Sequence, residues 1–170
     1  MGGLFGFPFV FRFVDRFRGY DPYQYVCDDC HDDCHCGYSD DVKERIEVYM
    51  EQTEKFKEMV AAHTRVDGNL IVSDLRGVDP IYTGNRFMIY SMYPEQNISA
   101  WIVSGRGGHG CSAAVGYSIL NRTATLDVGN LMLKYNGGGH KKVGTCQFSD
   151  ENMETELPKM LAELTAMANA

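Results

Sequence analysis

The sequence lacks several features that would assign a protein to a broad class at once. It has no stretch of about 18 uncharged apolar residues, so it predicts no membrane-spanning helix and no membrane partner. The formal net charge is −7, which argues against broad, non-specific binding to duplex nucleic acid because such binding needs a large basic surface. The phenylalanine-rich start is interrupted by charges and lacks a small-residue cleavage site, so we expect no signal peptide and a cytoplasmic protein.

The 170 residues do contain enough apolar material for one folded domain and an extension, since apolar residues make up 44% of the chain. Residues 1–38 differ in composition from the rest, and we expect an irregular arm without a core of its own. Within the arm, phenylalanines alternate with other residues, which is the periodicity of a strand, and Pro8 restricts it to an edge strand. These phenylalanines are Phe5, Phe7, Phe9, Phe11 and Phe13.

Four of the six cysteines lie inside this arm, within a single stretch of ten residues. Cys27-x-x-Cys30 is the spacing of half a zinc knuckle, and Cys34 with Cys36 or the histidine between them would complete a tetrahedral site, although the loop between the pairs is short. Cys27 and Cys30 with the next histidine also match the attachment motif of c-type haem, a chemistry that requires export. The neighbouring aspartates and histidines would suit a harder cation. Zinc at these cysteines, another metal and no site at all remain open alternatives.

The rest of the chain follows the order helix, four strands, helix, strand, helix. Residues 39–66 predict a connecting helix, because apolar side chains between Val42 and Val60 recur at alternating steps of three and four. Apolar runs bounded by turn residues predict strands at 70–75, 86–93, 98–104, 111–118 and 143–148. Two further stripes predict helices at 127–135 and 150–167. This order indicates an α/β fold, with a mixed sheet of about five strands flanked by helices.

Three consecutive glycines followed by a histidine form the most informative motif. Gly137, Gly138 and Gly139 mark a place where a side chain would be in the way, since glycine permits positive φ and close approach of backbone amides to a ligand. Successive amides in such a turn can form a concave nest for phosphate. His140 supplies a side-chain hydrogen-bond donor, and Lys141 adds positive charge.

An asparagine–arginine pair upstream strengthens this interpretation. The guanidinium of Arg122 can hold a phosphate through two parallel hydrogen bonds, and Asn121 could orient it or contact a base. Together with the glycine run, the pair favours a phosphate-binding loop. The alternatives are a flexible turn with an exposed histidine and a surface salt bridge for Arg122.

The motifs together resemble a known family. Asn121-Arg122-Thr123, Asp127-Val128-Gly129 and the run from Gly137 to Gly144 resemble the C-terminal substrate-binding domain of the DHH phosphoesterases. That family includes RecJ-type exonucleases, oligoribonucleases, cyclic-dinucleotide phosphodiesterases and exopolyphosphatase-like proteins. The resemblance implies a substrate-binding domain at 67–170, preceded by the connecting helix at 39–66 and the arm at 1–38. It also implies that the glycine–histidine run and Arg122 hold a substrate phosphate.

The sequence departs from the family in one large respect, because it contains no Asp-His-His motif. In the family, that motif and further aspartates hold two divalent metals, usually manganese, which generate the attacking hydroxide. The resemblance therefore implies a substrate-binding half without catalytic residues of its own, working with a catalytic domain in another chain. The implied ligands are a phosphorylated small molecule, a short oligonucleotide or polyphosphate. Two alternatives remain: a stand-alone module that binds phosphate or nucleotide without chemistry, and a structural protein that forms homo-oligomers and keeps a vestigial pocket.

Overall fold

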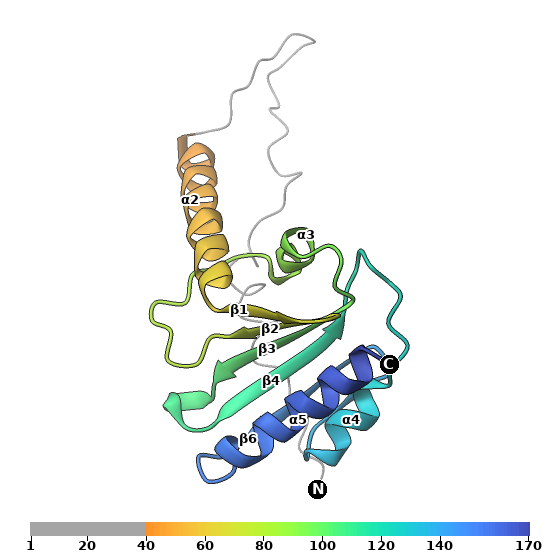
Figure 1. The fold of residues 1–170 in the computed structure, drawn as a ribbon. Coiled ribbons are helices and arrows are strands. Elements are labelled where there is room, and N and C mark those ends of the chain that lie inside the picture. Colours follow the sequence, from red (N-terminus) through yellow and green to blue (C-terminus); the bar gives the residue numbers. More distant parts are fainter. Residues whose placement is uncertain (1–39) are drawn as a thin grey trace, which may run out of the picture. The chain divides into compact units, whose positions relative to one another are not determined.

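The computed structural model of the chain describes residues 40–170 (Figure 1). Judged by its internal contacts, the stretch Lys43–Ala170 is one unit. The strand predicted from the alternating phenylalanines and the metal site predicted at the clustered cysteines lie outside the described residues. No helix in the described part is both long and apolar enough to cross a lipid bilayer.

The described chain begins and ends with a long helix, and strands and short helices alternate between them. The helices are α2 (Asp40–Ala62), α3 (Ile89–Met92), α4 (Val128–Lys134) and α5 (Met153–Ala168), with two short 3-10 helices, η1 (Arg86–Met88) and η2 (Arg106–Gly108). The strands are β1 (Thr64–Asp67), β2 (Leu70–Asp74), β3 (Ile98–Ser104), β4 (Cys111–Tyr117), β5 (Gly138–His140) and β6 (Val143–Phe148). This order confirms the predicted α/β class.

The six strands of the described part form one open mixed sheet, in the order β1-β2-β3-β4-β6-β5. β2 and β3 run parallel, and the other neighbouring pairs are antiparallel. Four of the five predicted strands are confirmed as β2, β3, β4 and β6. The two edge strands, β1 and β5, are not among those predicted, because four and three residues carry too little alternation to stand out.

The strand predicted at 86–93 is wrong, because these residues form η1 and α3. β2 and β3 are parallel neighbours, so the segment between them cannot be a tight turn and must cross over one face of the sheet. Asn85 begins the helical part, where its side-chain oxygen accepts a hydrogen bond from the backbone N–H of Phe87 at 3.0 Å. Ile89 and Tyr90 then turn inward and are buried. The apolar run thus covers the sheet instead of joining it.

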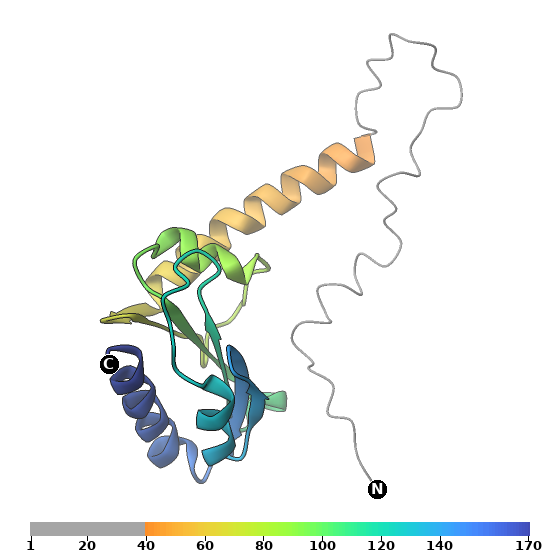
Figure 2. The ribbon, with the colours of Figure 1, turned by 90° about the vertical axis from the view of Figure 1, so that its right-hand side faces the viewer.

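The helices cover the two faces of the sheet unequally (Figure 2). α4 and α5 pack on one face along its length, and their buried residues form one core cluster with β2, β3, β4 and β6, which includes Leu70, Ile98, Val115, Met132, Met160 and Leu164. On the other face, α3 and the C-terminal half of α2 form a smaller cluster that includes Phe56, Val60, Ile71, Ile89 and Tyr90. This second cluster contains no residue of β4, β5 or β6. The described helices thus contribute no apolar cluster to that face of these three strands, where the hydroxyl of Tyr90 in α3 reaches Gly116 at the end of β4.

Candidate functional site

The predicted phosphate-binding run lies at one edge of the sheet and forms a strand there. β5 pairs antiparallel with β6, His140 lies opposite Val143, and Lys141 and Lys142 make the turn between them. Among residues 136–144, Asn136 alone has a positive φ, at 56°. The run therefore does not form the predicted nest, because no glycine in it has a positive φ and both Gly138 and Gly139 are paired with β6. Asn136 in the left-handed conformation ends α4 and turns the chain into β5.

Two of the three glycines are required by the fold itself. A Cβ at Gly137 would lie 2.7 Å from the Cβ of Cys146 and still closer to the carbonyl oxygen of Thr145. A Cβ at Gly139 would lie 3.0 Å from the carbonyl carbon of Val143 and would overlap the neighbouring backbone. A Cβ at Gly138, in contrast, would meet no atom within 4 Å. Packing of the described residues therefore explains Gly137 and Gly139 but gives no reason for a glycine at position 138.

The turn at Lys141 and Lys142 is fastened to two other elements. The backbone N–H of Val128, at the start of α4, donates to the carbonyl of Lys141 at 3.0 Å. The backbone N–H of Tyr117, at the end of β4, donates to the carbonyl of Lys142 at 3.0 Å. Asp127 caps α4 by accepting a hydrogen bond from the N–H of Asn130 at 3.0 Å. The end of β4, the start of α4 and the β5–β6 turn thus meet at one corner of the domain.

The loop that carries Asn121 and Arg122 starts and ends at this corner, because it joins Tyr117 to Val128. The side-chain amide of Asn121 donates to the carbonyl of Glu95 at 2.7 Å, and its oxygen accepts from the hydroxyl of Thr123 at 2.7 Å. These bonds hold the loop in shape, and the role of Asn121 toward Arg122 or a base stays a prediction. The structure brings this loop and His140 to the same corner, and within the described part no hydrogen bond joins the side chains of Arg122 and His140.

Arg122 itself projects into solvent beside the loop. Its Nε donates to the carbonyl of Ile119 at 3.1 Å, which fixes the stem of the guanidinium and leaves its two terminal nitrogens available. Within residues 44–170, neither Arg122 nor the exposed His140, Lys141 and Lys142 forms an ion pair. The exposed basic side chains of the β5–β6 turn and of the neighbouring loop are thus without an ion-pair partner within residues 44–170, in a chain whose net charge is −7.

The uncovered face of β4, β6 and β5 adjoins this corner. Strand partners directly opposite each other share a face, so His140 and Val143 lie on the same face as Gly116, which is opposite Val143 on β4. Of the other positions on this face, Gln147 bears a longer side chain, and the rest bear small side chains or none, namely Ser112, Ala114, Thr145 and Gly138. The face is therefore shallow and open, with His140 at its rim. Patterns in the sequence do not reveal this face, because it depends on which strands the helices leave uncovered.

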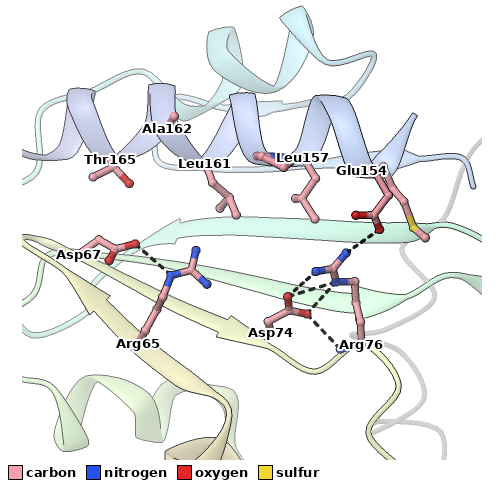
Figure 3. Close-up of a pocket in the computed structure, with 11 residues that line it drawn as sticks. Arg65, Asp67, Asp74, Arg76, Glu154, Leu157, Leu161, Ala162 and Thr165 are labelled. Atoms are coloured by element: carbon pink, nitrogen blue, oxygen red, sulfur yellow. Dashed lines mark hydrogen bonds and ion pairs between the residues drawn. The ribbon is translucent and has the colours of Figure 1, made fainter. Parts of the chain in front are cut away.

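A concave feature lies at the opposite edge of the sheet, as Figure 3 shows. It is a groove of about 350 Å³ between α5 and the strands β1 and β2, and none of the predicted phosphate-binding residues lines it. Its apolar side comes from α5, including Leu157, Pro158 and Leu161, and two arginine–aspartate pairs, one on β1 and one at the end of β2, line the other side. This groove was also missed from the sequence, although the Arg65-x-Asp67 spacing places that pair on one face of β1.

The pair at the end of β2 is tightly bonded. The guanidinium of Arg76 donates to Asp74 through Nη2 at 2.7 Å and through Nε at 2.9 Å. Partial burial opposes ionisation of Asp74, but the hydrogen bonds from Arg76 outweigh it and hold the pKa of this carboxyl below its usual value. The pair therefore stays ionised, and Asp74 neutralises the guanidinium of Arg76. Arg76 is for that reason poorly suited to bind an anion.

No protein-family model and no curated protein matches the chain. The comparison that decides the matter is with a solved structure, the pGpG-specific phosphodiesterase PggH from Vibrio cholerae, which is 40% identical over 76% of this chain with a TM-score of 0.70. The described domain resembles part of the DHH-family phosphoesterases. The predicted resemblance is thus confirmed, and the match covers 44% of PggH.

Two more distant DHH-family structures share the fold alone. An exopolyphosphatase-related protein from Bacteroides fragilis is 14% identical over 77% of this chain and 40% of its own length, with a TM-score of 0.52. A DHH-domain protein described as a member of a family of ribosomal proteins is 18% identical over 76% of this chain and 33% of its own, with a TM-score of 0.51. The chain thus spans less than half the length of each of these DHH-family proteins, and the similarity supports a phosphoesterase-related domain.

Proposed function

We propose that the described domain is the substrate-binding half of a DHH-type phosphoesterase and that it binds a phosphate of a nucleotide or nucleic-acid end at the β5–β6 corner. The observation that carries this proposal is the 40% identity to PggH, whose name gives pGpG as its substrate. The proposal is supported by the exposed basic side chains of His140 and Lys141 at the β5–β6 turn and of Arg122 on the loop that starts and ends beside it, since such side chains suit an anionic ligand.

In this proposal the residues of the corner divide into ligand-binding and supporting roles. His140 and Arg122 contact the phosphate, and Lys141 adds positive charge. Gly138 keeps the open face free of a side chain next to His140, which lets the backbone of β5 approach the ligand closely. Gly137 and Gly139 permit the close pairing of β5 with β6, and Asn121 supports Arg122 through its bonds to Glu95 and Thr123.

The metal chemistry of the family has no match in the described residues. No group of three or more histidine, cysteine, aspartate or glutamate side chains within them could hold a metal ion. The manganese that the resemblance implies does not fit this part of the chain, and we derive no hydrolytic step from it. In the proposal, a catalytic domain supplies the metals, and this domain supplies binding and orientation of the phosphate.

A titration followed by NMR tests the binding site. Adding pGpG, and inorganic phosphate in parallel, to the isotope-labelled chain should shift the backbone resonances of Gly138, Gly139, His140 and Lys141. Arg122→Ala should weaken pGpG binding by about tenfold or more, because a hydrogen bond to a charged group contributes about 1.5–3 kcal/mol and 1.4 kcal/mol is a factor of ten. Arg106→Ala is the matched control, since Arg106 is also an exposed arginine but lies in the β3–β4 connection.

Two results would contradict the proposal. If millimolar pGpG shifts no resonance at the corner, or if Arg106→Ala weakens binding as much as Arg122→Ala, the corner is not the binding site. A hydrolysis assay with pGpG and manganese separates the binding half from a complete enzyme. Turnover by the purified chain would show that catalytic residues are present within it.

A further inference from the structure

The exposed edge of β1 offers a self-complementary surface at the end of the sheet away from the phosphate corner. Within residues 40–170, β1 is the outermost strand on that side and pairs with β2 alone. Arg65 and Val66 are exposed, with 40% of Val66 accessible to solvent. An open edge strand presents a row of unpaired backbone donors and acceptors, and such a row is a template for pairing with another strand.

The hydrogen bonds between β1 and β2 determine which backbone groups face outward. The N–H of Asp74 donates to the carbonyl of His63 at 3.0 Å, so this pair of residues is a hydrogen-bonded pair. Hydrogen-bonded pairs alternate along antiparallel strands, so Arg65 with Val72 and Asp67 with Leu70 are bonded in the same way. The backbone groups of Val66 therefore point away from β2, toward the open edge.

The side chains of β1 alternate in charge in a way that matches a second copy of the same strand. We propose that two copies of this chain pair through β1, antiparallel and two-fold symmetric, with Val66 opposite the partner's Val66. In this register the two Val66 residues exchange N–H···O=C hydrogen bonds. Arg65 then lies directly opposite the partner's Asp67, and Asp67 lies opposite the partner's Arg65.

The same register suits the side-chain geometry. Arg65 and Asp67 share the face that lines the groove beside α5, and Figure 3 shows them pointing toward each other within one chain, with Nε 3.2 Å from Oδ2. Their pairing with the partner falls at a non-hydrogen-bonded position, where opposing side chains lie closest and opposite charges attract most strongly. Val66 lies on the other face, where the exposed valines of the two copies meet.

A second copy of β1 is the favoured partner for this edge. An antiparallel copy places an aspartate opposite Arg65 and an arginine opposite Asp67. An isologous contact uses each arginine–aspartate pairing twice, so one four-residue strand supplies two cross-strand ion pairs and two backbone hydrogen bonds. The contact is smaller than a standard protein interface, so we expect a dimer whose population rises with protein concentration. It would join two sheets into one and leave both phosphate corners at the far ends.

Charge reversal and charge exchange test this pairing with the full chain. Arg65→Asp places two acids opposite each other at both positions of the dimer, and Asp67→Arg places two bases there. Each single variant should weaken dimerisation, measured by sedimentation equilibrium, by about tenfold or more. The double variant R65D/D67R restores opposite charges and should restore the dimer. Arg106→Asp, a charge reversal at an exposed arginine far along the chain, should leave it unchanged.

Val66→Pro provides an independent test, since it removes an N–H that has no partner in β1–β2 pairing and blocks both hydrogen bonds of the dimer. Circular dichroism of each variant checks that the domain stays folded. The proposal is overturned if the wild-type chain stays monomeric at the highest attainable concentration, or if its dimer withstands the single reversals. A double variant that remains monomeric overturns the register about Val66.

Discussion

Three single variants, in which alanine replaces Gly137, Gly138 or Gly139, should separate the glycines that the fold requires from the one that it does not. The structure ranks them by what a new Cβ would meet. At Gly137 it would lie 2.7 Å from the Cβ of Cys146, and at Gly139 it would lie 3.0 Å from the carbonyl carbon of Val143. At Gly138 no atom lies within 4 Å. The first two neighbours belong to the paired strand β6, which cannot rotate away as a flexible side chain could.

The expected free energies follow from these contacts. Overpacking a well-packed region costs about 1–3 kcal/mol, so Gly137→Ala and Gly139→Ala should lower the free energy of unfolding by at least that amount. Gly138→Ala meets open space at an ordinary φ and restricts the unfolded chain, which should stabilise the domain by about 0.4–1 kcal/mol. The Gly137 and Gly138 variants should therefore differ by about 1.4 kcal/mol or more.

Urea unfolding followed by circular dichroism measures this difference, with a constant m-value showing that the denatured state is unchanged. The reasoning is refuted if Gly138→Ala loses as much stability as Gly137→Ala. The same Gly138 variant then tests the proposed site, since a folded and stabilised domain that binds pGpG more weakly would show that the missing side chain serves the ligand.

Three further predictions concern other parts of the domain. Asp127→Ala removes the cap of α4 and should cost about 1 kcal/mol of unfolding free energy, measured by urea titration, and an unchanged midpoint would contradict the capping role. Because the pKa of Asp74 is lowered from 3.8 in the folded state, its ionisation stabilises the fold above pH 3.8, and this contribution is lost as the pH falls through the lowered value. The Asp74→Asn variant should therefore show a shallower loss of stability in acid, and equal slopes for the two proteins would refute this. Burial raises the pKa of Cys146 to about 12 and also raises that of Cys111, so both thiols should resist alkylation at about pH 8 until the domain unfolds, which peptide mass spectrometry of labelled protein can follow.

Local patterns in the sequence predict most of the elements but not how the sheet is assembled. The stripe from Val42 to Val60 and the strands β2, β3, β4 and β6 carry clear periodicity, and the structure confirms them. The segment at 86–93 is equally apolar, yet it is helical because β2 and β3 turn out to be parallel and their connection has to cross a face. Strand order is a long-range property that alternation within a segment does not encode.

The candidate site shows the same division between local and long-range information. The chemical character of His140, Arg122 and the glycines can be read from the sequence, and so can the need for missing side chains at Gly137 and Gly139. The conformation of the glycine run cannot be read from the sequence, because glycine is compatible with both a nest and an extended strand. Pairing with Val143–Phe148 selects the strand. The open face beside His140 follows only from the positions of the helices on the two sides of the sheet.

The loop from Ser118 to Asp127 has a consequence for how such a domain can diversify. Its two ends are tied to consecutive carbonyls, those of Lys142 and Lys141, so the distance that it must span is fixed by the turn and not by its own length. Closing a longer loop costs little additional free energy, since each doubling of length adds only about 0.6 kcal/mol. Insertions and deletions near Arg122 can therefore change which ligand the corner binds while the register of the sheet stays the same. Ligand preference can then change in evolution without a change in the fold.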